Sequence, residues 1–396
     1  MKLLHTADWH IGRTLNGYSL LAEQKAVFAQ IVQIAQDEEV DGIVIAGDLY
    51  DRAIPSPEAV TTLDQMFRTL NLEKKIPIYA ISGNHDSARR LNYGRKWLEE
   101  TNFYLHTLLE EAFTPIETPT LQIFLLPFFD PLDARVYYQK KDLPAEDVAQ
   151  IKTIADALEL VIADLVELFD PTKKHLLVTH FAVTAHQEDS LDLTSETTSQ
   201  VGGLATVTTK QFAAFDYVML GHIHTRHASP APTVRYAGSP VKFNVKEARA
   251  KNNQKSVEIV DFTAQKIQQK VCKLIPQTDL VVLEADWETL CDPSFYQQQP
   301  VGQAWFAITI QNFERSAHLQ TNLRSELEKR YGTIVELDYQ TNSTSTFAPQ
   351  ESTDLREISP EKIVNNFFQT ITAYELSPAQ KDLVAKIFNE VEREQK

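Results

Sequence analysis

The chain has 396 residues, 43% of them hydrophobic and 23% charged, as in an ordinary folded globular protein. This length exceeds what one hydrophobic core usually holds, so we expect two or three domains. The net charge of −16 at pH 7 argues against a free-standing nucleic-acid binder, which gains affinity from a global excess of basic residues.

Other bulk features favour a cytoplasmic protein that does not enter a membrane. The two cysteines, Cys272 and Cys291, lack the spacing of a disulfide framework or a cysteine metal site. No apolar stretch approaches the roughly 18 residues that span a bilayer, and the polar start of the chain differs from a signal peptide.

The first half of the chain alternates strand-like and helix-like segments. Strands are expected at residues 3–6, 42–46 and 76–81, and helices at 21–35 and 56–70. In the second helix, Ser56 and Pro57 have the residue types of an N-cap and a first helical position. This βαβαβ pattern predicts an α/β sheet with crossover helices.

Further strands and a long helix complete the predicted first domain, residues 1–275. The strands are expected at 121–126, 175–179, 217–220 and 234–237, the amphipathic helix at 147–168, and a β-rich stretch at 256–274.

The remaining sequence predicts a small second domain and a helical tail. Segments 280–283, 305–310, 319–330 and 334–337 suggest a β-β-α-β unit within a domain at 276–339. A Thr-, Ser- and Asn-rich linker follows at 340–354, and the tail at 355–396 holds helices near 359–372 and 377–391. These two helices are too short to build a core, so we expect them to dock on the chain or on a partner.

Five clusters of potential metal ligands each follow a predicted strand. They are Asp8-Trp9-His10, Gly47-Asp48-Leu49-Tyr50-Asp51, Gly83-Asn84-His85-Asp86, Thr179-His180 and Gly221-His222-Ile223-His224. Loops at the carboxyl ends of strands form the ligand crevice of open α/β sheets. We therefore predict one polar site along one edge of a sheet.

The donor types in these clusters favour two transition-metal ions. Carboxylate, carboxamide and imidazole donors together suit manganese, iron, zinc or cobalt. Seven candidate ligands are too many for one ion and enough for two if a carboxylate bridges them, which is the arrangement used in phosphate-ester hydrolysis. A glycine precedes Asp48, Asn84 and His222, where we expect it to allow a sharp backbone turn.

Several features have an ordinary structural explanation. An isolated histidine is more often a core or surface residue than a ligand, and this interpretation applies to His5, His106, His186 and His318. His227 is left outside the ligand set. The basic segment 242–255 is either a solvated hairpin or a phosphate-facing loop beside the site.

The ordered motifs DxH, GDxxD, GNHD, H and GHxH resemble the calcineurin-like metallophosphoesterases. The strings KLLHTADWHIGR, IVIAGDLYDRAIPS, ISGNHDSARRL, VGG at 201–203, DYVMLGHIH and YAGSPVKFNVKEA further resemble the SbcD family of bacterial nuclease subunits. The resemblance is strong over residues 1–275 and extends to the rest in layout only. It implies a two-layered β-sandwich flanked by helices, a small α/β capping domain that faces DNA, and a helical tail.

The resemblance also assigns the site residues. It implies that one metal ion is bound by Asp8, His10, Asp48 and His224, and the other by Asp48, Asn84, His180 and His222, with manganese as the usual ion. His85 is then no ligand but stabilises the transition state and helps to protonate the leaving alkoxide, with Asp86 orienting its ring.

The implied activity is DNA phosphodiester hydrolysis in repair, replication and recombination, exonucleolytic (3′ to 5′) on duplex ends and endonucleolytic on single strands and hairpins. The implied partner is SbcC, a coiled-coil ABC-type ATPase bound by the tail, with a homodimer inside a heterotetramer. Candidate DNA contacts are Arg13, Arg89, Lys242 and Lys246. Where the family often has a proline-glutamine pair after GHxH, this chain has Thr225-Arg226-His227, which puts the local DNA contact in doubt.

Two rival functions use the same motifs. A stand-alone metallophosphoesterase would act on small phosphoesters or phosphoproteins, and activity on such esters but none on DNA would favour it. A scaffold that has lost catalysis would show eroded ligands, whereas every ligand position is filled here.

Overall fold

The computed structural model describes residues 1–186, 207–250, 254–263, 266–314, 322–341, 360–372 and 375–394. These residues fall into two compact units, Met1–Thr341 and Asn342–Lys396. The first unit contains both of the predicted domains that precede the linker.

A six-stranded mixed sheet forms one layer of the first unit. Its order is β15-β14-β1-β4-β5-β6, with bounds Gln268–Lys273, Ser256–Asp261, Lys2–Thr6, Gly42–Ala46, Ile78–Ile81 and Phe103–His106. Strands β1, β4, β5 and β6 are parallel, and β14 and β15 run antiparallel to their neighbours. The predicted β-rich stretch at 256–274 thus forms β14 and β15, and β14 pairs with β1, the first strand of the chain.

A five-stranded sheet forms the second layer. Its order is β13-β12-β9-β8-β7, with bounds Val234–Tyr236, Tyr217–Leu220, Lys174–Thr179, Leu121–Leu126 and Ile116–Glu117. All neighbours are parallel except β7 and β8. The short pairs β2 (Thr14–Leu15) with β3 (Tyr18–Ser19) and β10 (Val183–Thr184) with β11 (Val207–Thr208) lie outside both sheets.

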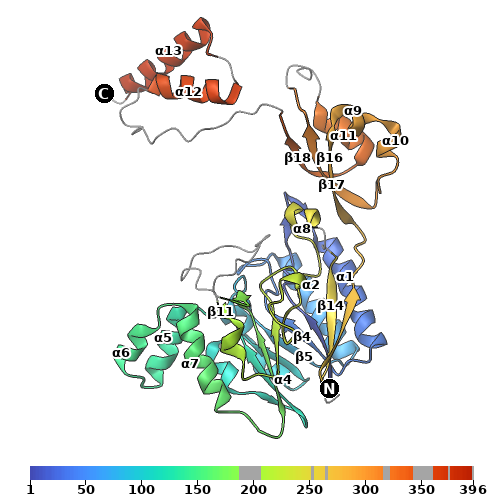
Figure 1. Ribbon diagram of the computed structural model, residues 1–396, viewed down its shortest axis with the longest axis vertical. Helices are drawn as coiled ribbons and strands as arrows, with labels where there is room; N and C mark the ends of the chain where they lie inside the picture. Colours follow the sequence, from blue (N-terminus) through green and yellow to red (C-terminus); the bar gives the residue numbers. More distant parts are fainter. Residues whose placement is uncertain are drawn as a thin grey trace. The chain divides into compact units, whose positions relative to one another are not determined.

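The two sheets pack face to face and are covered by helices on their outer faces, which is the predicted helix-flanked β-sandwich (Figure 1). Strand β4 shows how the sequence produces these layers. Its alternate residues Val44 and Ala46 lie in the core between the sheets, while Ile43 and Ile45 pack against the helices. A strand buried on both faces needs such an unbroken apolar run.

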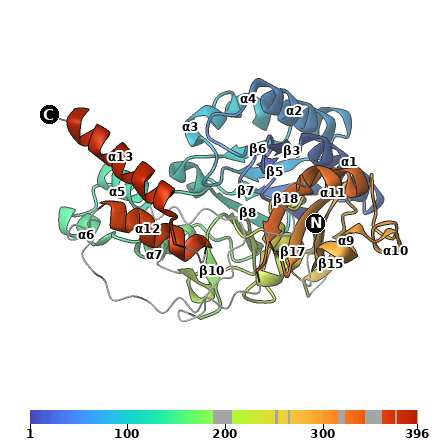
Figure 2. The same cartoon turned by 90° about the horizontal axis from the view of Figure 1, so that it is seen from above.

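The helices that cover the six-stranded sheet and those that cover the five-stranded sheet lie on opposite sides of the β-sandwich. Figure 2 shows α1 (Leu21–Asp37) and α2 (Pro57–Phe67) on one side and α5 (Pro131–Lys140) and α7 (Ile154–Val166) on the other. The predicted N-cap is confirmed, since the Ser56 side chain accepts a hydrogen bond from the Ala59 backbone N–H. A π-helical turn (Arg68–Glu73) follows α2, and the short α3 (Ala88–Leu91) and α4 (Arg95–Glu99) come after β5.

The prediction of one long helix over residues 147–168 is wrong. Helix α6 (Ala145–Gln150) ends first, and α7 begins at Ile154. The Thr153 side chain accepts a hydrogen bond from the Asp156 N–H, and the Asp156 carboxylate accepts one from the Thr153 N–H. This reciprocal capping starts a new helix in a stretch whose apolar periodicity alone suggests continuity.

The four predicted elements of the second domain occur in the predicted β-β-α-β order, but the prediction missed two short helices. Two short helices, α9 (Trp287–Cys291) and α10 (Pro293–Tyr296), separate β16 (Asp279–Asp286) from β17 (Ala304–Gln311), and α11 (Leu323–Tyr331) precedes β18 (Ile334–Tyr339). All three strands are parallel. Parallel neighbours need a crossover connection, and α9 and α10 lie within the first one.

This second domain packs onto the first. Leu280, Ala307 and Val335 belong to the same buried cluster as Leu15 and Leu20. The buried Glu23 carboxylate accepts hydrogen bonds from the backbone N–H groups of Gln277 (2.9 Å) and Thr278 (2.8 Å). The remaining face of the three-stranded sheet has its own core with α9 and α11.

The second unit contains α12 (Pro360–Thr372) and α13 (Pro378–Glu394), as the tail prediction requires. Most of the predicted linker lies outside the described residues. Among the described residues, no helix has the length and apolar character needed to cross a membrane.

Candidate metal centre

The five ligand clusters meet between the ends of the two sheets rather than along one sheet. Asp8 and His10 follow β1, Asp48 follows β4, and Asn84 follows β5, all in the six-stranded sheet. His180 follows β9, and His222 and His224 follow β12, in the five-stranded sheet. The six-stranded sheet thus supplies four of the candidate ligands and the five-stranded sheet three, which corrects the prediction of a single sheet edge.

Asp48 lies at the middle of the site. Its Oδ2 atom is 3.4 Å from His10 Nε2 and 3.3 Å from His180 Nε2, so one carboxylate oxygen faces a histidine from each sheet. The other oxygen, Oδ1, accepts a hydrogen bond of 2.9 Å from the His85 backbone N–H. This fixes the carboxylate in the orientation that a bridging ligand needs.

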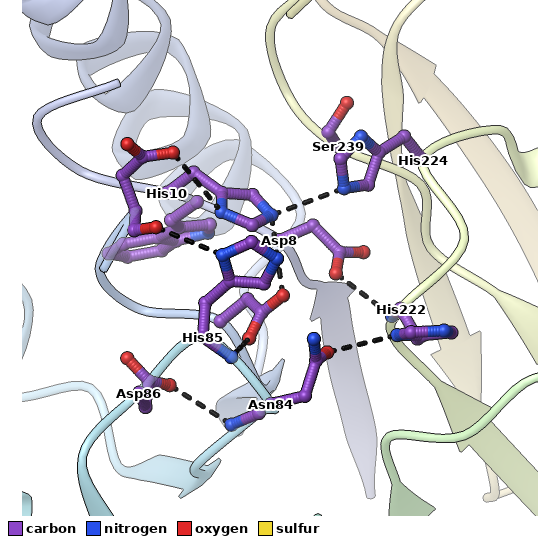
Figure 3. Close-up of polar contacts among 12 residues, drawn as sticks. Asp8, His10, Asn84, His85, Asp86, His222, His224 and Ser239 are labelled. Carbon is purple, nitrogen blue, oxygen red and sulfur yellow. Dashed lines mark hydrogen bonds and ion pairs between the residues drawn. The ribbon is translucent and has the colours of Figure 1, made fainter. Parts of the chain in front are cut away.

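Asn84 lies on one side of Asp48, close to two histidines of the five-stranded sheet. Its Oδ1 atom is 3.1 Å from His180 Nε2. The same oxygen is 3.0 Å from His222 Nδ1, a contact drawn in Figure 3. The Nδ1 atom of His180 lies 2.7 Å from the Ala46 carbonyl oxygen. If Nδ1 carries the proton and donates to that carbonyl, Nε2 presents its lone pair to the site.

Asp8, His10 and His224 form the other side. The His10 and His224 Nε2 atoms are 3.1 Å apart, and ligand atoms of all three residues lie within 4.8 Å of one another. Asp8 Oδ1 accepts a hydrogen bond from the His222 N–H, whereas Oδ2 is buried without a hydrogen-bond partner. A buried carboxylate oxygen without a donor is costly, and a cation would satisfy it, so these residues fit a metal ion.

The charges within the site depend on Asp48. Burial would raise the pKa of Asp48, but the His180 and His10 imidazoles outweigh this effect and hold it well below its ordinary value. Burial likewise lowers the pKa of His180, yet Asp48 and Asp8 raise it to about 9. Burial and the neighbouring His180 lower the pKa of His222 to about 3, and burial lowers that of His10. The Asp48 carboxylate is therefore ionised and faces a protonated His180, whereas His10 and His222 are neutral, and a metal ion bound at His180 would displace its proton.

Four of the ligands have a left-handed backbone. The φ angles of Asp8 (54°), His10 (43°), Asp48 (52°) and His222 (89°) are positive, which is uncommon for residues other than glycine. Each such conformation costs on the order of 1–3 kcal/mol and persists where the surrounding structure enforces it. Backbone hydrogen bonds from Asp8 to Gly47 and from His10 to Asp48 enforce it here.

The glycines that precede Asp48, Asn84 and His222 are needed mainly because a side chain would not fit at their positions. Only Gly47 of these three has a positive φ, so the expected turn is confirmed there alone. A Cβ atom on Gly47 would overlap the His180 ring, one on Gly83 the Asp48 carboxylate, and one on Gly221 the Ala46 carbonyl. At Gly47 and Gly221 the loops of the two sheets approach so closely that no side chain fits between them, and at Gly83 the crowding comes from the neighbouring loop of the same sheet.

The structure places Asp86 in a different role from the predicted one. Its carboxylate accepts hydrogen bonds from the backbone N–H groups of Leu49 (3.0 Å), Tyr50 (2.9 Å) and Gly83 (3.0 Å). It therefore ties the loop after β4 to the loop after β5. Burial and the nearby Asp48 raise the Asp86 pKa to about 7, and these N–H donors oppose that rise.

Asp51 is a site residue to which the sequence analysis assigned no role. Its backbone carbonyl oxygen is 2.9 Å from His85 Nδ1, so this carbonyl rather than Asp86 positions the His85 ring. Its carboxylate accepts a hydrogen bond of 2.9 Å from Arg13 and lies 3.9 Å from His10 Nδ1. The signal was present in the GDxxD motif, whose second aspartate follows Asp48 by three residues.

The four candidate DNA contacts differ in their surroundings. Arg13 pairs with Asp51 and lies over the Phe243 ring, and Lys242 pairs with Asp279 at 2.7 Å. Lys242 is thus paired within the protein, and its contact with DNA stays a prediction. Arg89 and Lys246 are exposed, so their contact with DNA stays a prediction. His227 is also exposed and lies in none of the metal-compatible groups found among the described residues.

Fold and site together define a metal-dependent hydrolase, and comparisons with known proteins agree. Residues 1–226 match the family model described as calcineurin-like phosphoesterase, and residues 276–372 match the one described as Type 5 capsule protein repressor C-terminal domain. Among solved structures, a dimetal phosphatase from Danio rerio covers 69% of this chain and 96% of its own at 11% identity. Its TM-score of 0.41 is too low to carry an argument.

Two relatives match nearly the whole chain. The SbcD subunit of the nuclease SbcCD from Staphylococcus epidermidis is 32% identical over 393 residues, with 98% of each chain covered. Its namesake from Staphylococcus saprophyticus is 31% identical over 387 residues, covering 98% of this chain and 97% of that one. The chain therefore belongs to the calcineurin-like phosphoesterase family, in the group of SbcD subunits of SbcCD nucleases.

Replacing Gly83 with alanine should disrupt the metal centre with little general damage. The added methyl group would displace the Asp48 carboxylate, and we expect affinity for divalent ions to fall roughly 10–100-fold by calorimetric titration. Gly302→Ala is the matched control, because Gly302 has a positive φ (82°) but no neighbour in the path of a Cβ. Equal metal affinity in the two variants would show that Asp48 is not constrained as described.

Proposed function

We propose that this protein is a nuclease subunit that hydrolyses DNA phosphodiesters with two divalent metal ions, most suitably Mn²⁺, in complex with an SbcC-type ATPase. The observation that carries the proposal is the position of Asp48 Oδ2 between His10 and His180, one histidine from each sheet. The names of the two nearly full-length relatives support DNA as the substrate.

The proposed ligand sets follow the two sides of Asp48. Asp8, His10 and His224 with Asp48 would hold one ion, and Asn84, His180 and His222 with Asp48 would hold the other. Bound ions of this kind polarise a phosphoryl oxygen and lower the pKa of a water molecule. The protein contributes ligands that are already in place and buried carboxylates that are already ionised.

His85 is the proposed proton donor. The Asp51 carbonyl fixes Nδ1, which leaves Nε2 as the nitrogen that can give a proton to the leaving oxygen. The ring packs edge-on against His10, with centroids 4.7 Å apart. His85 is close enough to His10 and Asp48 to serve as a ligand as well, and only measurement of metal binding separates the two roles.

The tail is the proposed partner-binding segment. Large apolar side chains are exposed one helical turn apart on both helices, Ile363 and Phe367 on α12, and Leu383 and Ile387 on α13. An amphipathic helix pair with such faces suits a coiled-coil or groove partner. Because the chain carries a charge of −16, such a partner would also supply the DNA affinity that this chain lacks.

Hydrolysis of small phosphoesters is the alternative function, since the same metal centre would perform it. Full-length similarity to the two nucleases, including the second domain and the tail, favours DNA. A scaffold without catalysis is disfavoured because the ligands converge and His85 is in place.

The substrate is tested with the purified chain, with and without Mn²⁺ and the co-purified ATPase, on linear DNA, hairpin DNA and a small phosphoester. We expect Mn²⁺-dependent cutting of both DNAs by the complex. His85→Ala should bind Mn²⁺ as the parent does and lose roughly 10²–10⁴-fold in cutting rate, the usual value of a general acid. The control His227→Ala alters an exposed histidine outside the metal-compatible groups and should cut at the parental rate.

Three results would contradict this account. Turnover of the small ester alone would favour the alternative function. A His85→Ala protein that cuts DNA at the parental rate would remove the proton-donor role, and one that binds fewer ions than the parent would make His85 a ligand.

Deletion of residues 350–396 should abolish association with the ATPase in a pull-down while Mn²⁺-dependent cutting of single strands remains. The metal centre lies within the unit Met1–Thr341, which the deletion leaves complete. A full-length Phe367→Asp/Leu383→Asp variant should show the same loss, and Lys386→Ala, a polar exposed change on α13, should not. Association that survives both the deletion and the double substitution would place the interface elsewhere.

A further inference from the structure

Glu247 is a buried carboxylate beside a proposed metal ligand. It lies within the string YAGSPVKFNVKEA but in none of the five ligand clusters, and no role has been assigned to it. It lies in the one-turn helix α8 (Val245–Arg249), is 4% exposed, and its Oε1 atom is 3.6 Å from His224 Nδ1. The opposite ring nitrogen of His224, Nε2, faces His10. The carboxylate therefore lies behind the imidazole, on the side away from the metal centre.

Lys255 holds this carboxylate in place. Its ammonium group donates a hydrogen bond of 2.6 Å to Glu247 Oε2 and further ones to the His224 carbonyl oxygen (3.0 Å) and to Ser239 Oγ (2.8 Å). One lysine thus binds both the backbone of the ligand and the carboxylate behind its ring. The Glu247 carboxylate also accepts a hydrogen bond of 3.0 Å at Oε1 from the Asn244 side-chain amide.

The carboxylate has a cationic partner in this setting. The Lys255 ammonium group and Glu247 Oε2 form an ion pair at 2.6 Å, and both side chains are largely shielded from solvent. A carboxylate behind a ligating histidine fixes the tautomer of the ring and strengthens the other nitrogen as a donor. His180 has only a neutral carbonyl, that of Ala46, at the equivalent atom.

Glu247 also takes part in the cap of helix α8, and this local role has to be distinguished from an effect on a metal ion. Asn244 caps α8 by accepting a hydrogen bond from the Glu247 N–H, and its amide also donates to the Glu247 side chain. If Glu247 served only to complete this cap, its loss would lower the melting temperature of the protein and would not distinguish between two ions.

We propose that Glu247, anchored by Lys255, is a positioning residue for His224 that sets the affinity of the ion held by Asp8, His10 and His224. The inference rests on the ligand sets of the proposed function. It predicts that the two ions respond unequally to a change at residue 247, because the carboxylate touches the ligand of one ion only.

The test is titration of the full-length protein with Mn²⁺, by calorimetry and by the electron paramagnetic resonance of free Mn²⁺. We expect the parent to bind two ions. Glu247→Gln should weaken one of them about 10-fold and Glu247→Ala about 100-fold, while the other keeps its parental affinity. The glutamine variant keeps an acceptor for the ring N–H and should therefore lose less.

Glu258→Gln is the matched control. Glu258 is also a buried carboxylate (1% exposed), but it pairs with Arg235 (3.5 Å) and Tyr217 (3.3 Å) instead of a ligand. Its substitution should lower the melting temperature of the metal-free protein and leave both affinities unchanged.

The possible results distinguish a failure of the inference about Glu247 from a failure of the proposed function. Two ions of parental affinity in both Glu247 variants would overturn the inference alone. Equal weakening of both ions, in step with a lower melting temperature, would reduce Glu247 to a structural role. A parent protein that binds no second ion would instead overturn the proposed function.

Discussion

The site depends on the register of one β-sheet against the other. Asp8, His10, Asp48 and Asn84 come from one layer and His180, His222 and His224 from the other, so a small slip would separate Asp48 from His180. The loops of the two sheets are in direct contact. The Ala46 carbonyl oxygen lies 2.7 Å from His180 Nδ1, and neither Gly47 nor Gly221 has room for a Cβ atom. Within the six-stranded sheet, backbone hydrogen bonds between the loops after β1 and β4 hold Asp8 and His10 in left-handed backbone, a cost that the apolar core between the sheets sustains.

Much of this arrangement was readable from the sequence. Apolar runs such as residues 42–46 predicted the strands, since buried parallel strands need them, and the polar cluster after each strand predicted the ligands. Assignment of each ligand to one ion came from the resemblance to a family and not from spacing. Ser56 and Pro57 predicted a helix start correctly, because capping is a local interaction.

The features that the sequence did not predict depend on contacts between residues far apart in the chain. The position of the ligand clusters after strands predicted that they meet, but not that the strands belong to two different sheets. Asp86 looked like a partner of His85 because it is adjacent in sequence, whereas the fold brings the Asp51 carbonyl there and turns Asp86 toward backbone N–H groups. Lys242 belonged to a basic run, yet its partner Asp279 lies in the second domain. The break before α7 was missed because apolar periodicity continues through a local cap.

The central claim is that Asp48 touches two metal ions at once. Its most direct test is anomalous scattering from crystals of the full-length protein grown with Mn²⁺, with data collected on both sides of the manganese absorption edge. We expect two peaks, roughly 3.5–4 Å apart, with the Asp48 carboxylate between them. One peak only, or an Asp48 carboxylate out of reach of either ion, would contradict the account.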